Sequence, residues 1–129
     1  MPASALGVWL KGLRDRRELS LRDLAQRSDV DHAYISRLET GAKEAPSDEV
    51  IDKLVSALTP TKREVKILRF LVIHPHVEPG LAEFARVDGS ISFDEFHMLT
   101  TVVNRGARPD YATSLARIRR FMKEEEEDG

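Results

Sequence analysis

One short stretch of the chain, LRDLAQRSDVDHAYISRLETG at residues 21–41, gathers side chains that can recognise a polar partner. His32, Tyr34 and Arg37 lie within six residues of one another, and each can donate hydrogen bonds. An arginine can also donate two parallel hydrogen bonds to a pair of acceptors. No pattern in the sequence joins a nucleophile to a base, and there is no glycine-rich phosphate loop. The chemistry that this stretch indicates is therefore binding rather than catalysis.

Two short helices must position these side chains, and the residues between the helices form a tight turn. Helical spacing predicts one helix at about 21–27, with Ser20 as its N-cap, and a second at about 31–40. Asp29 lies in the break, where one residue must adopt a positive φ, and Asp tolerates this conformation better than most residues. Ala25 is a small residue four positions before this turn residue, and apolar residues follow six and nine positions after it. This is the spacing of a helix-turn-helix unit.

The stretches LSLRDLAQRSDV and AYISRLETG, with the PS that follows, resemble the Cro/C1-type helix-turn-helix (XRE) family of transcriptional regulators. The resemblance covers about Leu6 to Leu58. In this family an arginine of the first helix commonly pairs with a glutamate near the end of the recognition helix. The resemblance implies this structural ion pair for Arg14 and Glu39. The family's Glu-x-Gly ending is also present, as Glu39-Thr40-Gly41.

The resemblance further implies which side chains contact DNA. Those implied to contact base edges in the major groove are His32, Ala33, Tyr34 and Arg37. Those implied to contact the DNA backbone are Ser20, Arg22, Thr40 and Lys43. An arginine can give two hydrogen bonds to O6 and N7 of guanine, and a small apolar side chain can touch a thymine methyl group. For Tyr34, packing in the core or against a partner is the alternative.

Two positions depart from the family pattern. Asp29 occupies the turn position where the family usually has glycine, which is expected to cost some stability without changing the fold. Leu21 occupies a position where the family often has a glutamine that anchors to phosphate. We expect this anchor to be missing, with Ser20 and Arg22 as substitutes.

The composition limits the class of protein and the way in which it binds. The chain has 129 residues, of which 41% are hydrophobic and none is cysteine, so a packed core is expected without disulfides or cysteine metal sites. The longest apolar run, Phe70 to Ile73, is too short to span a membrane, and the start of the chain has no signal pattern. The net charge is −2, so positive charge for DNA binding must be local.

Two groups of residues resemble cation sites without meeting their requirements. The loop VDGSISFDEFHML resembles the second half of a calcium-binding loop, but Phe84 and Arg86 would occupy the first two ligand positions. Neither an aromatic nor a cationic side chain can bind a hard divalent ion. His74, His76 and Glu78 lie close in sequence, but prolines intervene and no ligand motif supports them. We therefore expect no metal and no cofactor.

The second half of the chain is predicted to be helical and to make a subunit or partner contact. Thr61 and Glu64 predict a capping box for a helix that ends near residue 73 and is apolar almost all round, so its own domain or a second subunit must bury it. A short helix is expected at about 81–86, another after Ser92, and a last helix with a coiled-coil-like seam. The residues predicted to make the dimer or partner contact are Phe70, Leu71, Leu115, Ile118 and Met122.

Together these patterns predict an all-α protein. An N-terminal five-helix lambda-repressor-like helix-turn-helix domain at residues 1–59 is followed by a helical dimerisation or regulatory region at 60–123. Residues 124–129 are expected to be an acidic, flexible tail, because their negative charges oppose the dipole at the end of the last helix.

The function that this combination favours is sequence-specific DNA binding by a transcriptional regulator. We expect a homodimer that binds a palindromic operator in double-stranded DNA and represses its own or a neighbouring operon. The alternative is the antitoxin of a toxin–antitoxin pair, or a repressor controlled by a partner peptidase, with the C-terminal half binding that protein partner. We expect neither an enzyme nor a membrane protein. The expected location is the cytoplasm, of bacterial or phage type, and the nucleoid when DNA is bound.

Overall fold

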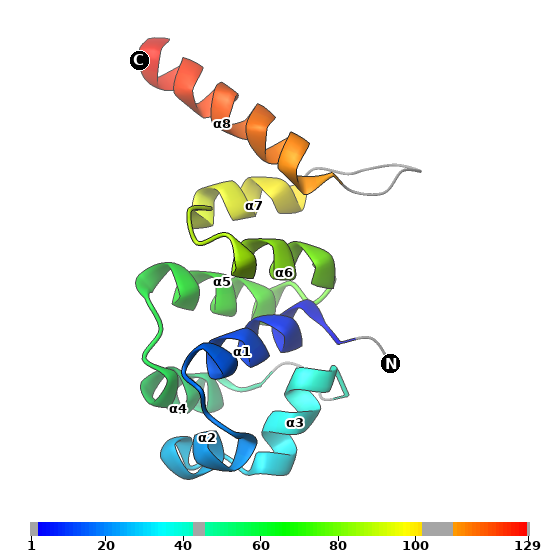
Figure 1. The fold of residues 1–129 in the computed structure, drawn as a ribbon, viewed down its shortest axis with the longest axis vertical. Coiled ribbons are helices and arrows are strands. Elements are labelled where there is room, and N and C mark those ends of the chain that lie inside the picture. Colours follow the sequence, from blue (N-terminus) through cyan, green and yellow to red (C-terminus); the bar gives the residue numbers. More distant parts are fainter. Residues whose placement is uncertain (1–2, 43–45, 102–109, 129) are drawn as a thin grey trace.

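The chain folds into helices throughout the part that the structure describes. The computed structural model describes residues 3–42, 46–101 and 110–128, and within these ranges it has eight helices and no strand (Figure 1). The helices are α1 (Ala5–Arg16), α2 (Leu21–Ser28), α3 (His32–Thr40), α4 (Asp48–Leu58), α5 (Lys62–Ile73), α6 (Pro79–Val87), α7 (Phe93–Thr101) and α8 (Tyr111–Asp128). The predicted all-α fold class is confirmed. None of the described helices is both long and apolar enough to cross a lipid bilayer.

The helices begin where short polar side chains satisfy the free N–H groups of the first turn. The side chain of Thr61 accepts a hydrogen bond from the backbone of Glu64, and the Glu64 carboxylate accepts one from the backbone of Thr61. The predicted capping box of α5 is thus confirmed. Ser20 forms the same reciprocal arrangement with Asp23 at the start of α2, and Ser47 caps α4. These caps fix the helix starts from local sequence alone.

The first helix lies at the centre of the molecule. It packs against α3 on one side and against α5 and α6 on the other, while α2 packs against both α3 and α4 (Figure 1). Trp9 is buried in this centre, and its indole N–H donates a hydrogen bond of 3.1 Å to the backbone carbonyl of Glu64. The hydrophobic core is therefore continuous across the predicted boundary at residue 59, and the division into two domains stays a prediction.

Two helix ends differ from the sequence-based expectation. α6 begins at Pro79 with Glu78 as its N-cap, two residues before the predicted start. Proline is well suited to the first helical position, because the N–H that it lacks would have no acceptor there. α8 continues as a helix to Asp128, through the acidic residues that were expected to fray. The flexibility of this tail stays a prediction.

Arg63 links α5 to the end of α6 and to the loop that follows it. Its guanidinium donates hydrogen bonds to the backbone carbonyl of Ala85 at 2.8 Å, to that of Asp88 at 3.2 Å, and to that of Ile91. Ala85 and Asp88 belong to the C-terminal end of α6, where carbonyl groups lack helical partners and a positive charge is favourable. The guanidinium also lies 5.7 Å from the centre of the Trp9 ring, and burial lowers its pKa from the ordinary value.

Replacing this arginine tests its structural role. Arg63→Met removes the donors while keeping much of the apolar stem, so the carbonyl groups at the end of α6 lose their partner. We expect the free energy of unfolding to fall by about 2 kcal/mol, as for the loss of charged hydrogen bonds, measured by urea denaturation. Lys66→Met, the same kind of change at an exposed position of the same helix, is the control. Equal stability of the two variants would contradict the role assigned to Arg63.

Candidate nucleic-acid interface

The turn between α2 and α3 sets the angle at which α3 leaves the body of the protein. Asp29 ends α2 with φ 59° and ψ 35°, so the positive φ expected at this residue is confirmed. The hydroxyl of Ser28 donates to the carbonyl of Leu24 at 2.6 Å and accepts from the backbone N–H of Val30 at 3.3 Å. The turn is thus held by a buried serine as well as by the apolar side chains of Leu24, Val30 and Ile35 around it.

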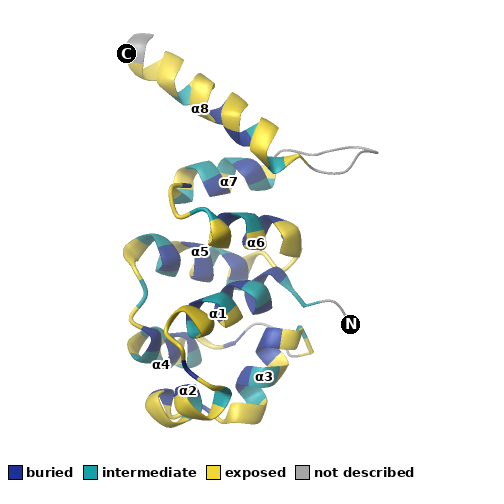
Figure 2. Ribbon diagram, in the orientation of Figure 1, coloured by how far each residue is buried: buried dark blue, intermediate teal, exposed yellow. Residues whose placement is uncertain are grey.

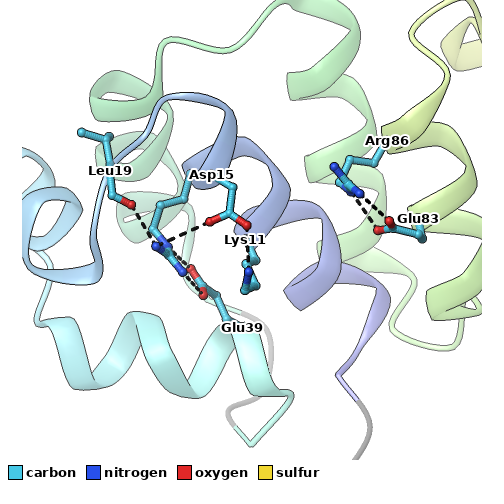
Figure 3. Close-up of polar contacts among 7 residues, drawn as sticks. Lys11, Asp15, Leu19, Glu39, Glu83 and Arg86 are labelled. Atoms are coloured by element: carbon cyan, nitrogen blue, oxygen red, sulfur yellow. Dashed lines mark hydrogen bonds and ion pairs between the residues drawn. The ribbon is translucent and has the colours of Figure 1, made fainter.

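The C-terminal end of α3 is fixed to α1 by an ion pair. The guanidinium of Arg14 donates two hydrogen bonds to the carboxylate of Glu39, of 2.7 and 2.8 Å, and a third of 2.8 Å to the backbone carbonyl of Leu19 (Figure 3). The two side chains are only 11% and 7% exposed. The hydrogen bond to Glu39 raises the pKa of Arg14 above its ordinary value. The structure thus brings together the two residues for which the family resemblance implied a pair.

A close approach of the two backbones accompanies this ion pair. Gly7 of α1 lies so near the end of α3 that a Cβ at this position would be 2.8 Å from the carbonyl oxygen of Leu38, and closer still to that of Glu39. Any larger residue at position 7 would therefore collide with main-chain atoms, which cannot rotate away. The sequence analysis did not single out Gly7. The only signal was a glycine inside a helical pattern, which costs helix stability and often has a packing reason.

α3 is exposed along one side and buried along the other (Figure 2). His32, Ala33 and Arg37 are exposed, and all three belong to the predicted base-contact set. Tyr34, the fourth member, is half-buried and packs against the core. The imidazole Nδ1 of His32 lies 3.8 Å from a carboxylate oxygen of Asp31, the residue before the helix. The helix therefore presents two hydrogen-bonding side chains and one methyl group to the outside.

The residues predicted to contact the DNA backbone have different surroundings. Ser20 and Arg22 are exposed at the start of α2, but the backbone N–H of Ser20 is already bonded to Asp23. That hydrogen bond lowers the pKa of Asp23, so this helix start carries a negative charge. Thr40 is exposed, and its hydroxyl donates to the carbonyl of Arg37 at 3.4 Å. Lys43 lies outside the described residues.

Most of the residues predicted to make a dimer or partner contact lie inside the chain's own core. Leu71 is 1% exposed, and Leu115 and Ile118 are buried where α8 packs against α7. Phe70 and Met122 are half-buried, and the Phe70 ring lies among other aromatic rings. Intrachain contacts already bury the leucines and the isoleucine, so little of their surface is left for a second subunit. The predicted subunit or partner contact stays a prediction.

The loop that resembles a calcium site has an internal hydrogen-bonding pattern. The carboxylate of Asp88 accepts hydrogen bonds from the backbone N–H of Ser90 at 2.9 Å and from its hydroxyl at 2.6 Å. These bonds lower the pKa of Asp88. Within the described ranges, no group of three or more acidic, histidine or cysteine side chains is arranged to hold a metal ion.

Comparison with known proteins finds similarity in this region of the chain. Residues 5–65 match the family described as "Helix-turn-helix domain". The chain is similar to the HTH-type transcriptional repressor RghR of Bacillus subtilis, with 41% identity over 54 residues, which are 42% of this chain and 40% of that protein. It is also similar to the uncharacterized HTH-type transcriptional regulator Rv0474 of Mycobacterium tuberculosis, with 33% identity over 69 residues, 54% of this chain and 48% of that one. The matched region thus spans less than half the length of each relative.

Two glycines of α1 give a matched test of the contact between α1 and α3. Gly7→Ala places a methyl group against the main chain of α3 and should lower the free energy of unfolding by about 2 kcal/mol, as overpacking does. Gly12→Ala places it against the side chain of Arg86, which is exposed and can move. That variant should stay within about 1 kcal/mol of the wild type, because alanine favours the helix. Denaturant unfolding measures both, and equal losses would contradict the special role of Gly7.

Proposed function

We propose that this protein is a sequence-specific DNA-binding transcriptional regulator and that α3 is its recognition helix, since residues 5–65 match a helix-turn-helix family and the relatives are named as HTH-type regulators. The observation that carries the proposal is the contrast between the two sides of α3. The buried side is fixed to α1 through Gly7 and the Arg14–Glu39 pair, whereas His32, Ala33 and Arg37 are exposed on the opposite side. A helix anchored in this way can enter the major groove without deforming.

Each exposed side chain of α3 has a chemical role in this proposal. Arg37 donates two hydrogen bonds to O6 and N7 of a guanine, the commonest specific contact in the major groove. His32 donates to a base or to a phosphate, and Ala33 contacts a thymine methyl group. Tyr34 supports this face from its half-buried position. Ser20, Arg22, Thr40 and Lys43 are the proposed contacts to the DNA backbone, which set the register of α3 along the groove.

The charges around this face favour base-specific contacts over general attraction to DNA. Asp23 and Asp31 are exposed at the N-terminal starts of α2 and α3, and the whole chain has a net charge of −2. Carboxylates in these places oppose phosphate, so few counterions are released on binding and the affinity for random DNA is low. Discrimination then depends mainly on the contacts made by α3.

A dimeric repressor is the finer form of this proposal. A single recognition helix reads few base pairs, and two copies related by a two-fold axis read a palindrome. One relative is named an HTH-type transcriptional repressor, which supports repression as the direction of regulation. The target that we propose is the protein's own or a neighbouring operon. The antitoxin alternative would suit a C-terminal half that folds only on its partner. Here α5 and α6 pack against α1 within the single chain, which favours the regulator.

Selection of bound sequences from random DNA tests the proposal. The wild type should yield a palindromic consensus, and Arg37→Ala should lose the preference at one base of each half-site. A loss of about 1–3 kcal/mol of discrimination is expected at that base. Arg22→Ala should instead weaken binding to all sequences and reduce the slope of log affinity against log salt by about one.

Lys66→Ala, at an exposed position of α5, is the control and should leave both the consensus and the salt slope unchanged. If the wild type selects no consensus, the proposed function is wrong. If Arg37→Ala weakens binding to all sequences equally, Arg37 contacts phosphate and does not recognise a base.

A further inference from the structure

The last helix, α8, has contacts along only one of its sides. It packs against α7 through Leu115 and Ile118, and Arg119 forms an ion pair of 2.9 Å with Glu95. From there the helix projects away from the rest of the molecule (Figure 1), and most of its surface is exposed (Figure 2). An isolated helix of 18 residues gains little stability from propensity alone. A second contact along α8 would stabilise it.

A second stripe of α8 carries the features of such a contact. Phe121 is 51% exposed, although it is among the largest apolar side chains of the protein. Arg117 lies four residues before Phe121 and Glu125 four residues after it, so all three share one face of the helix. Both charged side chains are exposed, and the structure pairs neither of them with another described residue. Along this stripe the helix thus carries a positive, an aromatic and a negative side chain, in that order.

Two copies of this stripe are complementary in charge when the helices run in opposite directions. In an antiparallel pair of α8 helices, Phe121 meets Phe121 of the second copy, and each Arg117 faces a Glu125 from the other chain. The wider sequence follows the same pattern, because the basic residues 117, 119, 120 and 123 precede the acidic run that starts at residue 124. A parallel pair would instead place each charge beside its like. An antiparallel partner also places positive charge beside the C-terminal end of α8, where acidic residues oppose the helix dipole.

We propose that α8 is the subunit contact, and that it pairs antiparallel with α8 of a second copy of this chain around a two-fold axis at Phe121. This inference deepens the proposed function, because a two-fold pair is what a palindromic site requires. It uses a different face of α8 from the buried Leu115 and Ile118. The recognition helix α3 lies at the opposite end of the molecule from α8, so the contact leaves α3 uncovered (Figure 1).

Cysteine cross-linking of the full chain tests the register directly, because the natural sequence contains no cysteine. Phe121→Cys places a thiol at the proposed axis and should form a disulfide-linked dimer under mild oxidation. Lys123→Cys is the matched control on the opposite side of the helix and should remain monomeric. Arg117→Cys alone should not cross-link, because antiparallel pairing separates the two copies of position 117 by about 12 Å along the axis. A disulfide needs Cα atoms within about 7 Å of each other.

Mixing Arg117→Cys chains with Glu125→Cys chains should then give the mixed disulfide. Cross-linking of Lys123→Cys as fast as that of Phe121→Cys would overturn the proposal. So would faster self-linking of Arg117→Cys than of the mixed pair, because that result means parallel helices.

The molar mass of the unmodified chain provides a second readout without DNA. At about 100 µM the wild type should approach twice its monomer mass of 14.6 kDa. Phe121→Asp should weaken association by about tenfold or more, whereas Lys123→Asp should not. Circular dichroism shows whether each variant keeps its helices. A wild-type monomer at every concentration, or equal association of both variants, would overturn the proposal.

These outcomes are separate from those of the proposed function. A chain that pairs through α8 but selects no DNA sequence contradicts the proposed function and supports the subunit contact. A chain that stays monomeric but selects a DNA sequence supports the proposed function and contradicts the subunit contact.

Discussion

The main chains of α1 and α3 meet at Gly7, and this contact determines which part of α3 faces outward. With no side chain at position 7, the end of α3 lies directly on α1, and Glu39 reaches the guanidinium of Arg14. A pair of charges that is mostly removed from water is costly to break, because the remaining partner is left without compensation. The pair therefore resists rotation of α3. The opposite side of α3, with His32 and Arg37, is exposed and is the surface left for the proposed contact with DNA.

The same helix α1 also joins α3, the proposed recognition helix, to the rest of the chain. Its opposite side packs on α5 and α6, and Trp9 donates to the backbone of α5. Arg63 then links α5 to the end of α6 and the loop that follows. A series of helix contacts thus runs from α3 to α7, and α8 lies at its far end (Figure 1). In the proposed dimer, the position of one recognition helix relative to the other depends on this series of contacts. The proposal therefore requires that each helix contact in the series holds its geometry.

Local sequence predicted the elements well where the determining contacts are themselves local. The turn residue Asp29, the capping box at Thr61 and the all-helical class follow from short-range spacing and hydrogen bonding. Contacts between distant segments were harder to predict. Nothing near Gly7 in the sequence indicates the carbonyl groups of α3, because a backbone contact leaves no side-chain pattern. Apolar periodicity likewise predicted that Leu71 and Leu115 are buried, but it did not distinguish the chain's own helices from a second subunit. The Arg14–Glu39 contact was indicated only by the family resemblance.

The most direct test of the central claim removes one acceptor atom from the DNA. In a selected binding sequence, each guanine is replaced in turn by 7-deazaguanine, which lacks N7, and the affinities of the wild type and of Arg37→Ala are compared. If α3 reads the major groove, one position per half-site should cost the wild type about tenfold in affinity and cost the variant nothing. An equal loss for both proteins at every position, or no loss at any guanine, would contradict the assignment of α3 as the recognition helix through Arg37.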